Sequence, residues 1–153
     1  VAGDRAPDAP CVTVTGRPVR LFDLLRGPHW TLLGFDVRPE QPAGPVRVVG
    51  IGVVGIGAVG IGTDVLDNGG HAARAYAASA GELVLIRPDG YIGIRTSAAA
   101  AVADYLSKLG VDQLPPVSFA QTGYLPHRPR GICAAWARSV RAGMTIRSGR
   151  HSD

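Results

Sequence analysis

The sequence predicts an α/β fold in which a mixed β-sheet is flanked by helices. Two apolar runs, at residues 30–35 and 46–52, are typical of strands buried on both faces of a sheet. A tight turn at residues 88–90, Pro-Asp-Gly, joins two further apolar segments and predicts an antiparallel hairpin. An Ala-rich segment after this hairpin predicts a closing helix.

The first half of the chain is expected to be mainly extended. Its predicted strands are 11–14, 19–21, 30–35 and 46–52. A Pro-rich lead-in at residues 3–10 precedes them, and a turn at 15–18 makes a hairpin of the first two. Residues 22–25 predict one helical turn, stopped by the Gly-Pro pair that follows. Three prolines at 36–45 predict a loop between the two buried strands.

The second half adds helices. The predicted elements are a turn at 67–70, a helix at 71–80, hairpin strands at 82–87 and 91–95, and a helix at 98–109. Gly81 ends the first helix, whereas Ser97 caps the second and Gly110 closes it. Two buried strands with helical crossovers and a terminal antiparallel hairpin are compatible with a thioredoxin-like core. We expect this domain to span residues 1–112.

Residues 48–62 consist of three tandem pentapeptides, VVGIG, VVGIG and AVGIG. A period of five matches neither a strand nor a helix, and a five-residue shift exchanges the two faces of a strand. We therefore interpret one copy as the original strand and two as an insertion; a long bulged strand or a Gly-rich loop are the alternatives. A helix of fifteen residues would reach about 22 Å, too short to span a bilayer.

Charge is unevenly distributed along the chain. The 153 residues include 16 basic and 12 acidic side chains, a formal charge of +4. Residues 113–153 hold six arginines and one acidic residue, with weak apolar periodicity, and predict an irregular basic tail. Ile132, Trp136 and Val140 fit one stripe of a basic helix there. The domain before the tail is nearly neutral, so the overall charge does not indicate a nucleic-acid partner.

No catalytic, cofactor-binding or metal-ligating constellation is visible in the sequence. Cys11 and Cys133 are far apart and predict two free thiols in a cytoplasmic protein, since no secretory signal is present. The histidines have no second ligand at metal-binding spacing; they are His29, His71, His127 and His151. We expect His29 to be a turn residue and His71 to begin a helix.

Two blocks together resemble a known domain. They are GDRAPDAP with GRPVRLFDLLRGPHWTLLGF, and ELVLIRPDGYIGIR with the Ala-rich helix that ends at Asp104, Tyr105 and Leu106. These blocks resemble the C-terminal thioredoxin-like domain of FAD-dependent aromatic-ring hydroxylases, the class A flavoprotein monooxygenases. The resemblance covers residues 2–109 and leaves the tail without a counterpart.

The resemblance implies a parent enzyme that uses NAD(P)H to reduce FAD and hydroxylates an aromatic substrate. Its FAD fingerprint would lie in a separate domain. GIGVVG at residues 50–55 matches G-x-G-x-x-G, but no helix signal follows, so we attribute it to the repeat. Redox thioredoxins need a reactive thiol after the first core strand, and Asp36, Val37, Arg38 and Pro39 stand there. We therefore expect no cofactor in this chain and no catalysis by it alone.

The expected role is packing against the FAD-binding and substrate domains, in cis or in trans, or contact within a homo-oligomer. The chain starts at Val1 and its single methionine is Met144, so we expect a non-standard start codon, a piece of a longer protein or a truncated remnant. The alternative function is a small protein that binds nucleic acid or an anionic membrane through its arginine-rich tail. A third hypothesis is a degenerate thiol enzyme with a reactive Cys11.

Overall fold

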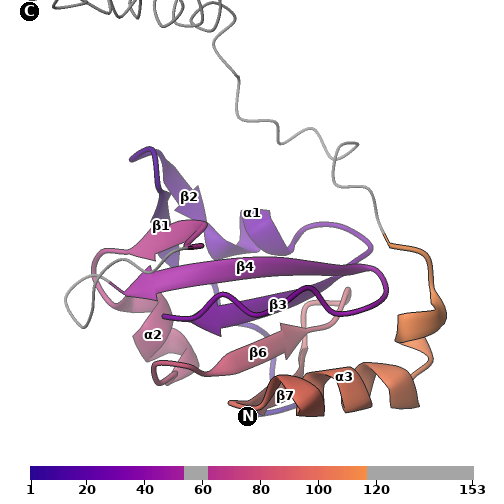
Figure 1. The fold of residues 1–153 in the computed structure, drawn as a ribbon. Coiled ribbons are helices and arrows are strands. Elements are labelled where there is room, and N and C mark those ends of the chain that lie inside the picture. The colour runs from indigo at the N-terminus through magenta and orange to yellow at the C-terminus, as the bar shows by residue number, and fades with distance from the viewer. Residues whose placement is uncertain (54–61, 117–153) are drawn as a thin grey trace, which may run out of the picture. The chain divides into compact units, whose positions relative to one another are not determined.

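The protein is described from a computed structural model in which residues 1–53 and 62–116 are placed. The strands are β1 (Pro10–Thr13), β2 (Pro18–Arg20), β3 (Trp30–Phe35), β4 (Val46–Val53), β5 (Val65–Asp67), β6 (Leu83–Ile86) and β7 (Ile92–Thr96). The helices are α1 (Leu21–Leu25), α2 (His71–Tyr76), α3 (Ala99–Lys108) and the 3-10 helix η1 (Val111–Gln113). The described strands form one seven-stranded sheet in the order β2-β1-β5-β4-β3-β6-β7 (Figure 1).

The sheet is mixed, as predicted. β4 lies at its centre, parallel to β3 on one side and to β5 on the other, and β3 pairs antiparallel with β6. β1 pairs antiparallel with both β2 and β5, and β7 closes the other edge beside β6. A mixed sheet with flanking helices is the architecture that the sequence predicts.

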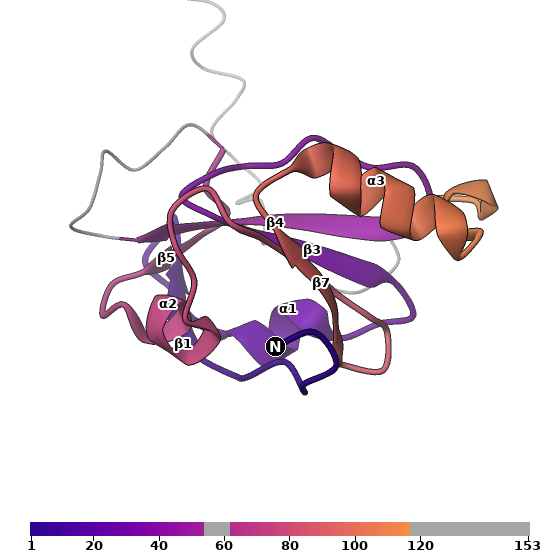
Figure 2. The same ribbon diagram turned by 90° about the horizontal axis from the view of Figure 1, so that it is seen from below.

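Helices cover the sheet on both faces. α1 and α2 lie on one face, and α3 lies on the other (Figure 2). The α1–α2 face holds the larger core, where the ring of Phe35 packs at 5.7 Å from that of Tyr76. The α3 face holds a smaller core around Leu85, Val102 and Leu106. Burying these apolar side chains on two faces supplies the main driving force for folding.

Several predicted boundaries are confirmed. The strand at residues 30–35 matches β3 to the residue, and His71 begins α2 as expected. The helix expected to reach residue 80 ends instead at Tyr76, because Ala77 adopts a left-handed conformation with φ of 46°. A residue in this conformation cannot continue a right-handed helix. β5 is not among the predicted strands, because the sequence pattern places Asp67 in a turn.

One further expectation is wrong. Ser97 does not cap α3: the cap residue is Ala98, whose N–H donates to Thr96 Oγ1 at 3.0 Å. The loop predicted at residues 36–45 is confirmed, since these residues connect the two buried strands β3 and β4 without a helix. A helix is the usual connection between parallel neighbours, so its place over the sheet is taken by the Pro-rich loop.

The first pentapeptide, residues 48–52, lies within β4. Of the other two copies, only Val53 and Gly62 belong to the described residues, so the choice between insertion, bulged strand and Gly-rich loop stays a prediction. The predicted basic tail lies outside the described residues from position 117 onward, with its stripe of Ile132, Trp136 and Val140. In residues 1–53 and 62–116, none of the helices combines the length and apolar character needed to cross a bilayer.

Candidate functional site

The carboxyl end of β3 corresponds to the position of the reactive thiol in redox thioredoxins. In this chain the side chains at that position form hydrogen bonds with neighbouring backbone groups instead. Asp36 has a φ of 52° and accepts a hydrogen bond from the Val53 N–H at 2.7 Å. Arg38 donates to the Gly62 carbonyl at 2.8 Å and to Asp64 Oδ2 at 2.7 Å. Asp64 Oδ2 also accepts from the Gly50 N–H at 2.8 Å. These contacts form a polar clamp, Asp36–Arg38–Asp64.

The polar clamp holds the first residue of the second pentapeptide and the last residue of the third. Val53 is tied to Asp36, and Gly62 is tied to Arg38. A Cβ placed on Gly50 would meet the Gly62 carbonyl oxygen at 2.7 Å, so the returning chain lies directly against β4. The segment that leaves the sheet at Val53 therefore comes back beside the strand that it left.

Shortening the repeat by five residues is expected to leave the domain folded. Deleting residues 55–59 restores two perfect VVGIG copies and keeps Val53, Gly62 and the polar clamp. Gly50 lies about 10 Å from Val53 along the strand, and the three remaining linker residues reach that far. A shorter connection between Val53 and Gly62 also loses less entropy on closure, by about 1 kcal/mol. Thermal unfolding should stay cooperative, with a midpoint within a few degrees of the parent. A loss of the cooperative transition would contradict the insertion hypothesis.

The G-x-G-x-x-G match does not fit a dinucleotide. Gly50 and Gly52 lie inside β4, where a real fingerprint has a strand-to-helix turn. A Cβ on Gly52 would meet Thr63 Cγ2 at 2.9 Å, and the Gly62 carbonyl faces Gly50. The space that a pyrophosphate would need at these two glycines is thus filled by the chain itself. Gly55 lies outside the described residues.

Cys11 is a core residue of β1, where it pairs with Val19. Its side chain is 4% exposed. Burial, and then the nearby carboxylates of Asp67 and Asp8, raise the pKa of the Cys11 thiol to about 12. Because the thiolate is the reactive form of cysteine, this environment opposes the hypothesis of a reactive Cys11. Cys133 lies outside the described residues.

Native Cys11 is expected to resist thiol reagents. In a Cys133→Ser background, a pKa of about 12 in place of 9.0 lowers the thiolate fraction near neutral pH about a thousandfold. Burial slows access further. The measurement is the rate of reaction with a chromogenic disulfide in native buffer and in urea. Comparable rates in the two conditions would contradict the buried, protonated thiol.

Asp8, in the first block of the family resemblance, caps α1. Its Oδ1 accepts from the Phe22 N–H at 3.0 Å, and its Oδ2 accepts from Arg20 Nε at 2.6 Å. Burial alone would raise the pKa of Asp8, but the bonds from Phe22 and Arg20 outweigh it and the pKa is lowered. An anion at a helix N-terminus is favoured by the exposed N–H groups there.

The lowered pKa of Asp8 predicts a stability that depends on acidity. The folded state favours the ionised form of Asp8. The contribution of Asp8 to the free energy of unfolding is therefore present above its pKa in the unfolded chain, and it is lost as pH falls through its lower pKa in the folded state. Asp8→Asn should cost about 1 kcal/mol at pH 7, and its difference from the parent should shrink below about pH 4. Urea titrations at several pH values measure this. Asp23→Asn is the control, since Asp23 lies in the same helix and its ion pair among the described residues is with exposed Arg26, at 3.5 Å. A constant Asp8 difference across pH would contradict the assignment.

The histidines in the described residues do not form a metal centre. His29 lies in the turn before β3, as predicted, and is 2% exposed. Burial, and then the positive charge of Arg47, lower the pKa of His29. His71 is exposed and lies 3.3 Å from Arg74 through its Nδ1. Across residues 1–53 and 62–116, no three His, Cys, Asp or Glu side chains are arranged to hold a metal.

Asp67 is a structural residue that sequence reasoning missed. It ends β5 and is fully buried. Oδ1 accepts from the His71 N–H at 2.8 Å, and Oδ2 accepts from the Ala73 N–H at 2.9 Å. An Asp placed a few residues before an Ala-rich helix is a recognisable capping signal. The carboxylate therefore orients α2 on the sheet, and its role is structural.

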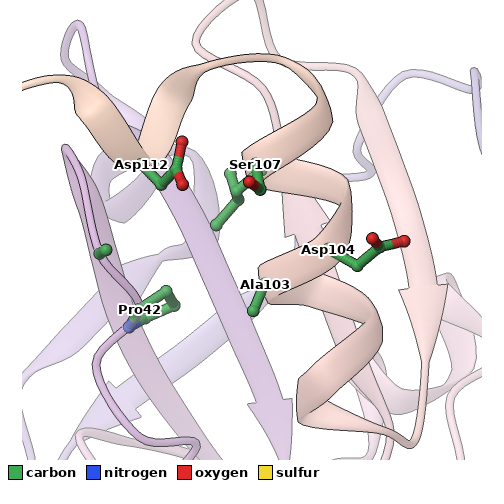
Figure 3. Close-up of a pocket in the computed structure, with 7 residues that line it drawn as sticks. Pro42, Ala103, Asp104, Ser107 and Asp112 are labelled. Carbon is green, nitrogen blue, oxygen red and sulfur yellow. The ribbon is translucent and has the colours of Figure 1, made fainter.

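The described part of the chain also has a shallow groove between the loop at 39–43 and α3. Two adjoining hollows of about 400 and 280 Å³ share Pro42 and Ala103 in their walls. Asp112, Ser107 and Asp104 line the larger hollow (Figure 3). Leu32 of β3 lies in the smaller one. No cysteine or histidine lines either hollow. The groove is therefore better suited to binding another surface than to catalysis by a thiol or an imidazole.

The sequence of the chain is similar to those of flavoprotein oxygenases. The family model described as aromatic-ring hydroxylase, C-terminal, matches residues 1–110. A flavin-dependent monooxygenase of Mycobacteroides abscessus is 40% identical over 108 residues. This match covers 71% of the chain and 18% of the monooxygenase. The chain thus spans less than one fifth of the length of this curated relative.

Solved structures share the fold at lower identity. A ternary complex of aklavinone-11 hydroxylase with FAD and aklavinone matches 71% of this chain and 21% of its own, at 23% identity and a TM-score of 0.50. The flavin-dependent monooxygenase PieE, in complex with FAD and substrate, matches 74% of this chain and 20% of its own, at 20% identity and a TM-score of 0.51. The thioredoxin domain of a thiol-disulfide oxidoreductase from Bacteroides vulgatus matches 71% of this chain and 97% of its own, at 14% identity and a TM-score of 0.50.

Proposed function

The chain belongs to the aromatic-ring hydroxylase C-terminal family, and we propose that it serves as the non-catalytic C-terminal domain of an FAD- and NAD(P)H-dependent aromatic hydroxylase. In this role it packs against the flavin-binding and substrate-binding domains, in cis or in trans, or contributes to an oligomer contact. The domain corresponds to residues 1–112, and residues 113–153 form a tail of the same cytoplasmic enzyme.

One observation carries the proposal that the domain is non-catalytic. At the carboxyl end of β3, Asp36 and Arg38 are used to hold Val53 and Gly62 in place. A thioredoxin-type reaction needs an accessible low-pKa thiol there. The one described thiol, Cys11, is buried in β1 with a raised pKa. The redox position of the fold therefore has a structural function in this chain.

The relatives support the flavin-dependent parent. The M. abscessus relative is named a flavin-dependent monooxygenase, and the aklavinone-11 hydroxylase and PieE structures contain FAD with aklavinone or another substrate. In these proteins the matched part is about one fifth of the chain. The remaining four fifths are large enough for the flavin and substrate domains. The alternative, a nucleic-acid or membrane protein acting through its tail, has no comparable support, because the family match ends at residue 110.

Flavin binding tests the proposal directly. The purified chain is mixed with excess FAD, passed through a desalting column and scanned for a flavin band near 450 nm. NADPH consumption is then followed by absorbance after FAD has been added back. We expect no retained flavin and no NADPH oxidation above the rate of free FAD. A chain that keeps one equivalent of FAD, or that oxidises NADPH faster, would overturn the non-catalytic assignment.

A further inference from the structure

The groove between the loop and α3 has walls of small or rigid side chains. On one side α3 presents three exposed alanines, Ala99, Ala100 and Ala103. On the other side are prolines of the 39–43 segment. Short side chains allow another backbone to approach closely, and they lose little rotamer entropy when they are covered. The groove is therefore suited to a polypeptide segment more than to a small molecule.

The groove is held open by contacts on both sides. Val102 and Leu106 anchor α3 in the core. In the loop, Gln41 Nε2 donates to the Val46 carbonyl at 2.6 Å. Gly44 has a φ of 91°, and a Cβ there would overlap the Val111 carbonyl, so the loop lies directly against η1. A pre-formed groove reduces the ordering cost of binding.

The groove is acidic and has one unsatisfied polar atom. Three acids line the two hollows, Glu40, Asp104 and Asp112, and neither hollow has a lysine or arginine in its lining. Asp104 already pairs with Lys108 at 2.7 Å. The Oδ1 atom of Asp112 is buried and has no hydrogen-bond partner among the described residues. An unpaired buried oxygen is costly, and a cation seated beside the Asp112 carboxylate in the larger hollow would compensate its negative charge.

We propose that this groove seats a segment of the flavin- and substrate-binding part of the parent monooxygenase, with a lysine or arginine of that segment at Asp112. This inference rests on the proposed function. The chain covers 18% of its monooxygenase relative, so most of that protein lies outside the matched domain and supplies the occupant. From Ala99 to Ser107 the helix wall is about 12 Å long, which accommodates about four residues of extended chain.

The test uses a chimaera in which this full chain replaces the matching segment of the M. abscessus monooxygenase. Hydrogen exchange is measured by mass spectrometry in the chimaera and in the free chain. We expect segments 39–43 and 99–107 to exchange about tenfold more slowly in the chimaera. Ala103→Arg, which fills the groove and adds a positive charge, should abolish this protection. Asp112→Asn, which removes the charge at similar size, should reduce the protection to about threefold, and unchanged protection would contradict a cationic partner at Asp112.

Ala75→Arg is the matched control, since Ala75 is an exposed alanine on α2, on the opposite face. It should leave protection of the groove unchanged. If the wild-type chimaera is protected and Ala103→Arg has no effect, the groove inference is wrong and the packing role stands. If Ala75→Arg removes the protection instead, docking occurs on the α2 face and the inference is also wrong. If no part of the chain is protected in the chimaera, the packing role fails, and the groove inference with it.

Discussion

Replacing Gly34 with alanine is expected to destabilise the domain by about 3 kcal/mol, although only one methyl group is added. Gly34 lies inside β3, where the chain turns back immediately after the strand. A Cβ at this position would overlap the Val37 carbonyl oxygen and lie 2.7 Å from Pro39 Cδ. The obstacle is backbone and a rigid ring, which cannot rotate away. The loop that replaces the crossover helix would have to lift from the sheet.

Urea titration of Gly34→Ala measures this cost. The control is Gly16→Ala: Gly16 has a φ of 82°, and a Cβ added there would meet no atom within 4 Å, so only left-handed strain of about 1 kcal/mol applies. The larger Gly34→Val should fail to give a cooperative transition. Equal midpoints for the two alanine variants would show that the 36–39 turn does not lie against β3 as described.

Removal of the Asp67 carboxylate is the second large effect that we expect. Asp67→Ala leaves the partly buried N–H groups of His71 and Ala73 without their acceptors, and it opens a small cavity beneath α2. Two lost charge-assisted bonds at a helix start together cost about 3 kcal/mol. Asp67→Asn retains one acceptor oxygen and turns its amide donors toward the second N–H, so an intermediate loss of about 2 kcal/mol is expected.

Unfolding midpoints in urea measure the Asp67 series. Asp104→Ala is the control, because its pair with Lys108 is exposed and worth about 0.5 kcal/mol. Circular dichroism should show whether α2 is lost in the folded state. An Asp67→Ala variant as stable as Asp104→Ala would mean that α2 does not depend on its buried cap.

The fold could be predicted where a single segment determines its own structure. β3 has an apolar run bounded by Pro28 and the Pro-rich loop, and the hairpin of β6 and β7 has its Pro-Asp-Gly turn. β5 could not be predicted, because three residues carry no periodicity and become a strand only by pairing with β1 and β4. The sheet order depends on such long-range pairing.

Other differences come from competition between neighbours. Thr96 and Ser97 are adjacent hydroxyl residues, and the sequence does not tell which will bond the start of α3. α2 stops at Ala77, whose carbonyl accepts from Arg95 Nη2 at 3.2 Å, a partner 18 positions away. Alanine itself carries no stop signal. The absence of a redox thiol after β3, in contrast, could be predicted from four consecutive residues.

The candidate groove was outside the reach of sequence reasoning. Its walls come from two segments about 60 positions apart, the 39–43 loop and α3. Alanine, proline and serine are ordinary surface residues in each segment taken alone. Only the omission of a crossover helix brings them together over β3, and the sequence predicted the loop without showing what the loop would face.

The short pairing of β1 with β5 affects local opening of the domain and the order in which it folds. Among the described residues, two residue pairs join the hairpin of β1 and β2 to the rest of the sheet, Val12 with Leu66 and Thr13 with Val65. β3, in contrast, is paired along six positions with β4 and along four with β6. We therefore expect the amino-terminal hairpin to open more readily in a sub-global opening than β3, β4 and β6, whose amide protons should exchange mainly on global unfolding. The residues paired between β1 and β5 lie far apart in the sequence, so docking of the hairpin is expected to be a late, slow event in folding.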